Sequence, residues 1–307
     1  MQKIIPHLWF DGQAEEAADY YISIFNNSKK LDVDYYDKAS AEASGMPAGS
    51  VLGVEYEIEG FRFYNLNGGP DFHFTPAISF FINCRSEAEV EQLWNRLSEG
   101  GKVLIALDKY PFSDKYGWIE DKFGASWQLM LCSECEQKVI PSLMYVGNNT
   151  GRAEEAIKFY TSVFEDSKIG SISRYGVGME PNREEYINHA AFTLAGQKFA
   201  AMDSALDHQF NFTEGVSLLV NLNSQEEIDY LWDKLSVVPE AEICGWLKDK
   251  FGVSWQIVPE ILNKYLRDPD KEKAGRVMEA FLKMKKINIA ELEAAYESKS
   301  KSSSVSN

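Results

Sequence analysis

The sequence predicts an α+β protein in which one strand-helix-three-strand module occurs four times and is followed by C-terminal helices. Two observations support this fold class. Residues 13–29 recur at 152–168 with the shared pattern AEEA…Y.S.F..SK, and the block GWxxDKFGxSWQ occurs at both 117–128 and 245–256. Self-similarity of this kind indicates a duplicated structural unit. We therefore expect two related copies, each holding two modules.

Hydrophobic periodicity predicts the order of elements in the first copy. Apolar residues at helical spacing predict a helix over 14–25, and alternation with period two predicts a hairpin over 54–65. The apolar run 77–83 is typical of a buried strand, and a Ser-x-x-Glu capping box begins a helix over 86–97. Three further strands are predicted at 102–108, 116–120 and 126–131.

The second copy repeats this order in a shorter form. Ser224 and Glu227 form the matching capping box, but the two repeated blocks lie about ten residues closer together than in the first copy. We assign the deletion to the counterpart of residues 101–115. The copies are predicted to span residues 1–138 and 139–262 and to have similar folds.

A helical extension is predicted after the second copy. An Asp-Pro-Asp helix start at 268–270 and apolar residues at helical spacing predict helices near 271–285 and 289–297. The extension, residues 263–297, is expected to pack onto the preceding domain. Residues 298–307 are rich in Ser and Lys and are predicted to be a disordered tail.

Charge and composition limit the possible partners and the compartment. The chain has 47 acidic and 31 basic residues, for a net charge of −16. Such a field repels phosphate backbones and anionic lipid, so we expect no nucleic-acid and no membrane partner. The first ten residues lack the apolar run of a signal peptide, which indicates a cytoplasmic protein. Cys132 and Cys135 form a CxxC without a second pair and are interpreted as reduced thiols near a strand end.

The repeated modules resemble a known superfamily. Paired modules with PHLWFDGQAEEAADYY at 6–21 and DKFGASWQ at 121–128 are similar to the vicinal oxygen chelate superfamily of glyoxalases, bleomycin resistance proteins and extradiol dioxygenases. Within it, residues 1–297 resemble the PhnB-like group labelled 3-demethylubiquinone-9 3-methyltransferase. The resemblance implies a curved sheet around an open cleft in each copy. Metal-dependent members hold a divalent ion there with His and Glu from symmetry-related strands.

Only part of that ligand set is present in this sequence. His7 matches the first-strand His, whereas Ser142 stands there in the second copy, and Gln128 and Gln256 stand where relatives place a Glu. The other two positions fall within 65–67 and 77–81, which contain no His, Asp or Glu; in the second copy Asp203 is the nearest carboxylate. A divalent cation needs several anionic or imidazole donors, so we predict no cofactor and keep a divalent metal as the alternative.

The remaining conspicuous residues have structural interpretations. In each DKFG block, Asp and Gly are expected to flank a turn, and the Trp residues around it are expected to fill the core. His73, His189 and His208 lie outside the matched ligand positions and are predicted to be structural or exposed.

These observations favour a small-molecule-binding protein, in the manner of the superfamily's drug-binding members. The predicted ligand-binding residues are His7, Trp9, Asn65 and Gln128, converging in the first copy, and Gln256 in the second. Trp9 joins His7 because alternate residues of a strand share a face. No catalytic residue is assigned, and the ligand is unidentified.

Two other classes of function stay open. One is an enzyme: a metal-dependent lyase, isomerase or dioxygenase, or the methyltransferase of the family label. For the last, the glycines at 176 and 178 are not followed by a helix pattern such as S-adenosylmethionine sites use. The other is an interaction module that acts through the C-terminal helices, which also makes a homodimer possible.

Overall fold

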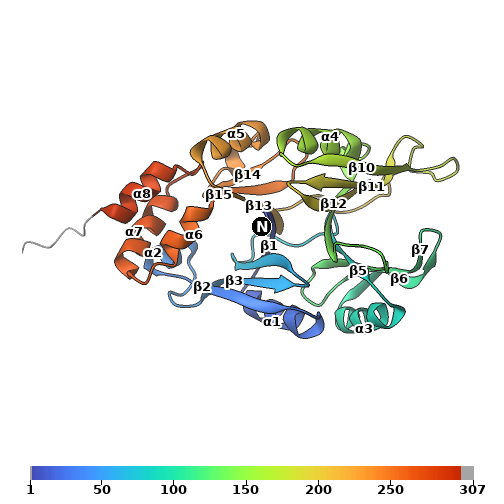
Figure 1. Ribbon diagram of the computed structural model, residues 1–307, viewed down its shortest axis with the longest axis horizontal. Coiled ribbons are helices and arrows are strands. Elements are labelled where there is room, and N and C mark those ends of the chain that lie inside the picture. Colours follow the sequence, from blue (N-terminus) through green and yellow to red (C-terminus); the bar gives the residue numbers. More distant parts are fainter. Residues whose placement is uncertain (1, 299–307) are drawn as a thin grey trace, which may run out of the picture.

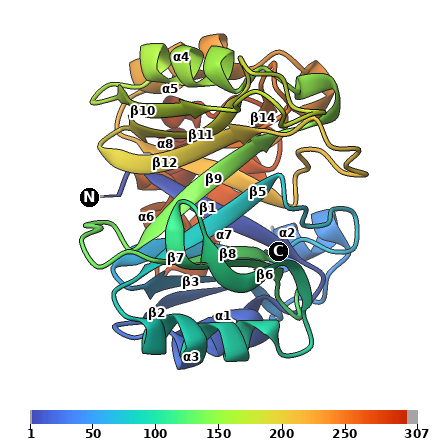
Figure 2. The same ribbon diagram turned by 90° about the vertical axis from the view of Figure 1, so that its right-hand side faces the viewer.

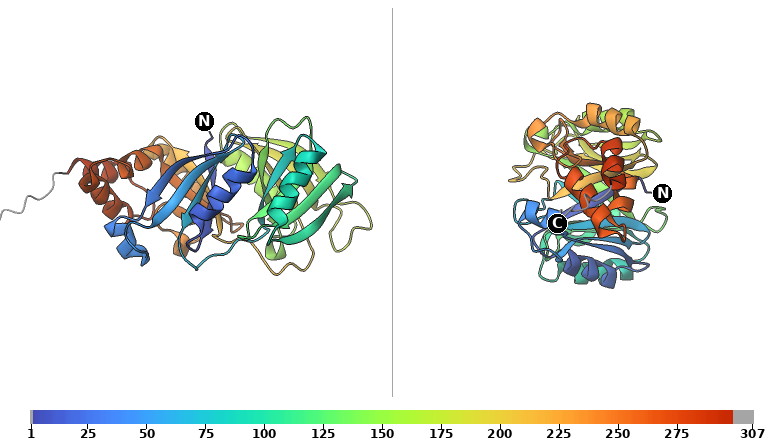
Figure 3. Two further views of the ribbon diagram at one scale, coloured as in Figure 1. Left: turned by 90° about the horizontal axis from the view of Figure 1, so that it is seen from below. Right: turned by 90° about the vertical axis from the view of Figure 1, so that its left-hand side faces the viewer.

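The computed structural model describes residues 2–298 and contains two β-sheets that lie side by side along the long axis of the molecule (Figure 1). Helices of the first copy run along one side of both sheets, helices of the second copy run along the opposite side, and the C-terminal helices stand at one end. The same arrangement is seen from below in the left part of Figure 3. The predicted tail at 298–307 lies, apart from its first residue, outside the described residues.

The first copy contains two modules, and its predicted helices and strands are confirmed. A short helix, α2, that the periodicity does not predict follows the second strand, and Asp37 caps its N-terminus by accepting a bond from the Ser40 N–H. The elements are β1 (Ile4–Phe10), α1 (Ala14–Ile24), β2 (Lys29–Tyr35), α2 (Lys38–Ser44), β3 (Val51–Ile58), β4 (Phe61–Asn67), β5 (Ile78–Cys84), α3 (Glu87–Ser98), β6 (Lys102–Tyr110), β7 (Ser113–Glu120) and β8 (Ser126–Leu131).

The second copy has one strand fewer. A 3₁₀ turn at Pro239–Ala241 stands where β6 lies in the first copy, so the expectation of three strands in the fourth module is wrong. The deleted residues are those that form β6. The elements are β9 (Val139–Tyr145), α4 (Ala153–Val163), β10 (Lys168–Arg174), β11 (Ile187–Leu194), β12 (Gln197–Asp203), β13 (Val216–Leu222), α5 (Gln225–Leu235), β14 (Trp246–Lys248) and β15 (Ser254–Pro259).

The C-terminal extension forms three helices, one more than the sequence predicts. They are α6 (Glu260–Leu266), α7 (Lys271–Phe281) and α8 (Ile289–Glu297). Asp270 caps α7 by accepting bonds from the N–H groups of Glu272 and Lys273, as the Asp-Pro-Asp motif predicts. No helix within residues 2–298 is long and apolar enough to cross a membrane.

Each sheet combines one module from each copy. Sheet A has the order β14-β15-β13-β1-β4-β3-β2, and sheet B has the order β10-β11-β12-β9-β5-β8-β7-β6. The copies meet through antiparallel pairs of first strands, β1 with β13 and β5 with β9. The expectation of one cleft per copy is therefore wrong, because each concave face is built from strands of both copies.

Helix caps and a common core attach the helices to the outer faces of the sheets. Ser86 and Ser224 accept bonds from the N–H groups of Glu89 and Glu227, which confirms both predicted helix starts. One apolar core links both sheets to α1, α3, α4 and α5.

A buried carboxylate in each DKFG turn ties a helix to a strand of the neighbouring module. Asp121, 3% exposed, accepts bonds from the Tyr21 hydroxyl on α1 at 2.7 Å and the Trp127 Nε1 on β8 at 2.8 Å. Its other oxygen accepts the N–H groups of Phe123 and Ala125. Asp249 repeats all four bonds with Tyr160, Trp255, Phe251 and Val253. Burial raises the pKa of the Asp121 carboxyl, and its four bonds oppose that rise.

Replacing Asp121 with Asn tests this junction. In either orientation of the amide, an NH₂ group faces two of the four buried donors, and an unsatisfied buried donor costs about 1–3 kcal/mol. We expect Asp121→Asn to lower the free energy of unfolding in urea by at least that amount. Asp11→Asn, on an exposed residue, is the control and should change it by less than about 0.5 kcal/mol. Equal stability of the two variants would contradict the assignment.

Candidate functional site

A cavity of about 1020 Å³ lies between the concave face of sheet A and the C-terminal helices. The right part of Figure 3 looks onto this end of the molecule and shows the helices in front of the sheet. The floor comes from the strands of sheet A, and the surrounding helices are α2, α6 and α7. The lining includes His7, Trp9, Tyr64, Trp246, Gln256, Leu262, Met278 and Phe281.

The C-terminal helices are packed onto sheet A, as the sequence predicts. A separate apolar cluster joins Leu219 and Val258 of the sheet to Leu262, Tyr265, Val277 and Leu292 of the helices. Cys244 and Gly245, just before β14, donate their backbone N–H groups to the carbonyls of Met284 and Lys285. The helices therefore form the outer wall of the cavity.

Arg267, at the end of α6, fastens this wall to the edge of sheet A. Its Nε and Nη2 atoms each lie 2.9 Å from a carboxylate oxygen of Asp34, and its Nη1 atom lies 3.0 Å from Asp32 and 3.2 Å from Glu55. Bidentate pairs of this kind are the stronger form of salt bridge. The Tyr64 hydroxyl also donates to Asp34, at 3.0 Å, so the fastening reaches the cavity floor.

His7 lies on the cavity floor as a neutral imidazole. Its ring stacks on Tyr64 with centroids 4.5 Å apart and planes 17° apart. Burial lowers the pKa of His7 to about 3. Within residues 2–298 its ring nitrogens make no hydrogen bond. A neutral imidazole with free nitrogens offers one donor and one acceptor to the cavity.

Trp9 and Gln256 join His7 in the same cavity. Trp9 shares the face of His7, as the strand alternation predicts, and its Nε1 donates to the carbonyl of Gly69 at 2.7 Å. Gln256 donates from Nε2 to the Ser217 hydroxyl at 2.8 Å, and Ser217 is the cross-strand partner of His7. The predicted site residues His7 and Trp9 of the first copy and Gln256 of the second copy thus line one cavity.

Two predicted site residues lie elsewhere. Asn65 is fully buried against α1, where it donates to the carbonyl of Ala14 and accepts from the Tyr56 hydroxyl. Gln128 lies on β8 in sheet B. The predicted convergence of Asn65 and Gln128 with His7 is therefore wrong. Asn65 is one residue out of register with the cavity face of β4, and sheet pairing across the copies separates Gln128 from His7.

The concave face of sheet B differs sharply from that of sheet A. Figure 2 looks onto it and shows that none of the described helices lies across it. Its own side chains fill it instead, so that even Ser142, the counterpart of His7, is only 2% exposed. The filling side chains include Phe81, Tyr116, Trp118, Met144 and Val146.

Polar groups on the face of sheet B are bonded to one another. Gln128 accepts from the Tyr116 hydroxyl at 2.6 Å and donates to the Ser79 hydroxyl at 2.8 Å. Trp118 Nε1 donates to the Ser126 hydroxyl at 2.7 Å. Both ends of the glutamine and the indole N–H are thus satisfied within the protein.

The same positions in sheet A are left open to the cavity. Cys244 replaces Tyr116 in the repeated block, so within residues 2–298 the Oε1 atom of Gln256 has no partner. Trp246, the counterpart of Trp118, turns its ring toward Trp9 with centroids 6.0 Å apart. Among the described residues its Nε1 makes no hydrogen bond, and the buried Ser254 hydroxyl has none either. The cavity of sheet A is therefore lined by Cys244 at the position where sheet B has Tyr116.

The side chains of the cavity floor do not suit a divalent metal ion. The residues at the centre of sheet A are His7, Tyr64, Ser217 and Gln256, which supply one imidazole and no carboxylate. No group of three or more His, Cys, Asp or Glu residues suited to a metal is found in residues 2–298. Zinc sites use three or four N, S or carboxylate ligands, and calcium sites use six to eight oxygens.

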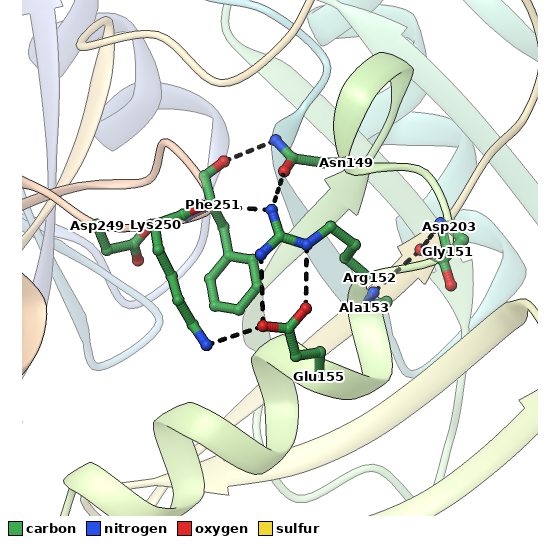
Figure 4. Close-up of polar contacts among 9 residues, drawn as sticks. All are labelled: Asn149, Gly151, Arg152, Ala153, Glu155, Asp203, Asp249, Lys250 and Phe251. Atoms are coloured by element: carbon green, nitrogen blue, oxygen red, sulfur yellow. Dashed lines mark hydrogen bonds and ion pairs between the residues drawn. The ribbon is translucent and has the colours of Figure 1, made fainter. Parts of the chain in front are cut away.

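Asp203, the nearest carboxylate in the second copy, serves the helix α4 instead (Figure 4). Its Oδ1 accepts the N–H groups of Gly151 at 2.8 Å and Ala153 at 3.1 Å, at the N-terminus of α4. Figure 4 also shows Arg152 beside Phe251, with its guanidinium bonded to Glu155. Asp203 is therefore a capping residue.

The cysteine pair departs from its interpretation. Cys132 and Cys135 form a disulfide, so the expectation of reduced thiols is wrong. Cys244 in the cavity wall is a free thiol, and burial raises its pKa to about 11. It is therefore protonated near neutral pH.

Sequence reasoning did not single out Tyr64, Trp246 and Arg267. Tyr64 precedes Asn65 on β4, so strand alternation places it on the opposite face of the sheet, which is the cavity face. Trp246 matches Trp118 in the repeated block, so both are predicted to fill the core. The signal for a difference is that Tyr116, two residues before Trp118, is replaced by Cys244 before Trp246. Arg267 carries no local signal, because its carboxylate partners lie more than two hundred residues earlier.

The two paired-module sheets, each curved around a concave face, define a glyoxalase-type fold. A family model described as 3-demethylubiquinone-9 3-methyltransferase matches residues 2–130 and again residues 137–258. The chain belongs to this family, with two copies of its domain.

Several solved structures are similar to this chain. A putative 3-demethylubiquinone-9 3-methyltransferase, the PhnB protein of Bacillus cereus, is 36% identical, with a TM-score of 0.39; the match covers 43% of this chain and 100% of that one. A protein from Staphylococcus aureus is 28% identical over 43% of this chain and 97% of its own, with a TM-score of 0.18. Glyoxalase I from Zea mays is 11% identical over 83% of this chain and 90% of its own, with a TM-score of 0.52, which shows the fold alone. No curated protein matched the chain.

The lowered pKa of His7 predicts a pH dependence of stability. Its ordinary pKa of about 6.5 applies in the unfolded chain, so unfolding takes up a proton between pH 6.5 and about pH 3. Compared with His7→Gln, the wild type should lose up to about 1.4 kcal/mol of unfolding free energy per pH unit as the pH falls below 6.5. Urea unfolding of both proteins between pH 7 and pH 4.5 measures the difference. An NMR titration of His7 with a midpoint near pH 6.5 would contradict the prediction.

The Arg267 contacts predict how firmly the C-terminal helices are held. Arg267→Met keeps the aliphatic stem but leaves three carboxylates without their guanidinium. We expect amide hydrogen exchange in α7 and α8 to become about tenfold faster or more, equivalent to ~1.4 kcal/mol. Arg183→Met, in an exposed loop, is the control. Unchanged exchange in α7 and α8 would show that apolar packing alone holds these helices.

Proposed function

We propose that the protein binds a small organic molecule in the cavity between sheet A and the C-terminal helices. One observation carries the proposal. In sheet B, Gln128 and Trp118 are hydrogen-bonded to other side chains of the protein. Their counterparts in sheet A, Gln256 and Trp246, line an open cavity instead. Buried polar groups in proteins nearly always have partners, so these groups call for a ligand or ordered water. A volume of about 1020 Å³ suits a drug-sized molecule.

The chemistry of the cavity floor favours binding over catalysis. An efficient general base has a pKa near the working pH, whereas the pKa of His7 is about 3. The Cys244 thiol, with a pKa raised to about 11, is a poor nucleophile near neutral pH. Both groups are suited to hydrogen bonding and packing.

The C-terminal helices support the same function. Their apolar residues pack onto sheet A in the cluster around Leu262 and Val277. Arg267 forms a salt bridge with Asp34 of the same sheet. These contacts turn a concave sheet into an enclosed site. A role in completing the cavity therefore explains the extension better than a role in recruiting a partner protein.

The proposal is tested on the molecule that the protein carries, identified by mass spectrometry after purification without chelator. His7→Ala should weaken its binding by about 1–3 kcal/mol, the cost of an unsatisfied buried partner, in a calorimetric titration. Ser142→Ala, the matched change in sheet B, should have little effect. Equal effects of the two changes would contradict the assignment of the site to sheet A.

A space-filling variant gives an independent check. Gly275 lines the cavity from α7, and a side chain added there meets open space. Gly275→Leu should abolish binding and raise stability, because Gly costs about 1 kcal/mol in a helix interior. Undiminished binding in this variant would refute the proposal. Micromolar binding of S-adenosylmethionine to the wild type would instead favour the methyltransferase named in the family description.

A further inference from the structure

The open polar groups of the cavity floor form an adjacent donor and acceptor. Gln256 on β15 and Trp246 on β14 are direct cross-strand partners. Directly opposed residues have Cβ atoms about 4.5–5.5 Å apart. The unpaired Oε1 of Gln256 is an acceptor and the unpaired Nε1 of Trp246 is a donor, so the pair presents one of each to the cavity.

Sheet B indicates which atoms complement such a pair. There the hydroxyl of Tyr116 donates a hydrogen to Gln128, and the hydroxyl oxygen of Ser126 accepts the hydrogen of Trp118. Tyr116 thus occupies the bonding direction that remains free at Gln256, where sheet A has Cys244 instead. Ser254, the counterpart of Ser126, is present in sheet A, but the Trp246 ring turns toward Trp9 and its N–H does not bond to Ser254. A ligand that pairs both free groups needs an N–H or O–H donor for the Gln256 oxygen close to an acceptor oxygen for the Trp246 N–H.

Aromatic side chains surround the pair. The His7 and Tyr64 rings are stacked, and Trp9 meets Trp246 edge to face, so flat surfaces border the floor. The carboxylates of Asp32, Asp34 and Glu55 lie on β2 and β3, at the opposite edge of sheet A, where all three bind Arg267. Burying an ion without a partner of opposite charge is expensive, which disfavours a charged group at this point.

We propose that the cavity floor recognises an uncharged, flat heteroaromatic ring whose edge carries an N–H donor beside a carbonyl acceptor, as in a lactam. The ring N–H donates to Gln256 Oε1, and the carbonyl accepts from Trp246 Nε1. The proposal rests on the proposed function, because it names the chemical class that binds in the same cavity. The cavity is larger than one such ring, so substituents of the ligand extend toward α6 and α7.

The probe for this edge is 2-quinolone, a neutral fused ring with adjacent N–H and C=O groups. It is compared by calorimetric titration with N-methyl-2-quinolone, which lacks the donor, with naphthalene, which lacks both groups, and with the N-methylquinolinium cation. We expect 2-quinolone to bind at least about tenfold more tightly than each comparator. Gln256→Met and Trp246→Phe should each remove about tenfold of that affinity. Gln128→Met, the matched change in sheet B, should leave it unchanged.

The outcomes separate this inference from the proposed function. If the cation or naphthalene binds best and Gly275→Leu abolishes that binding, the cavity is a binding site but the ligand class is wrong. If N-methyl-2-quinolone binds as tightly as 2-quinolone, or if 2-quinolone does not bind below 1 mM, the proposed edge recognition is also wrong. The proposed function itself fails when Gly275→Leu leaves the binding of the co-purified molecule unchanged.

Discussion

Both concave faces depend on the antiparallel pairing of first strands from different copies. In this pairing, His7 lies opposite Ser217 and Ser79 lies opposite Ser142. It satisfies backbone groups that would otherwise stand at an open sheet edge. It also decides which side chains meet, because the imidazole of the first copy reaches the glutamine of the second only across this seam. The cavity, its floor and its cover all follow from that arrangement.

Much of the fold is predictable from local patterns, and the site is predictable only in part. Helix and strand positions follow from periodicity. The family resemblance identifies His7 and Gln256 as candidates, and strand alternation adds Trp9. The error at Asn65 is one residue in a strand, which is enough to move a side chain to the other face of the sheet. The error at Gln128 has a different origin, since strand pairing between distant segments leaves no mark in the local sequence.

The two concave faces show how a small change converts a packed surface into a binding cavity. Tyr116 and β6 close one face with protein side chains, whereas Cys244 and the deletion of that strand leave the other hollow. The C-terminal helices then cover part of the hollow. Burial on the cavity floor lowers the pKa of His7, whereas a ring in open water would keep its ordinary value.

The joining of both copies in one polypeptide has a consequence for how the two faces can evolve. Separate identical copies that paired through their first strands would form a two-fold symmetric dimer, in which every substitution appears in both clefts. Assembly of such a dimer would also depend on protein concentration. The duplicated chain escapes both constraints: its halves meet at a high effective concentration, and each cleft draws on residues encoded only once. One cleft is therefore free to act as a rigid scaffold while the other acquires selectivity.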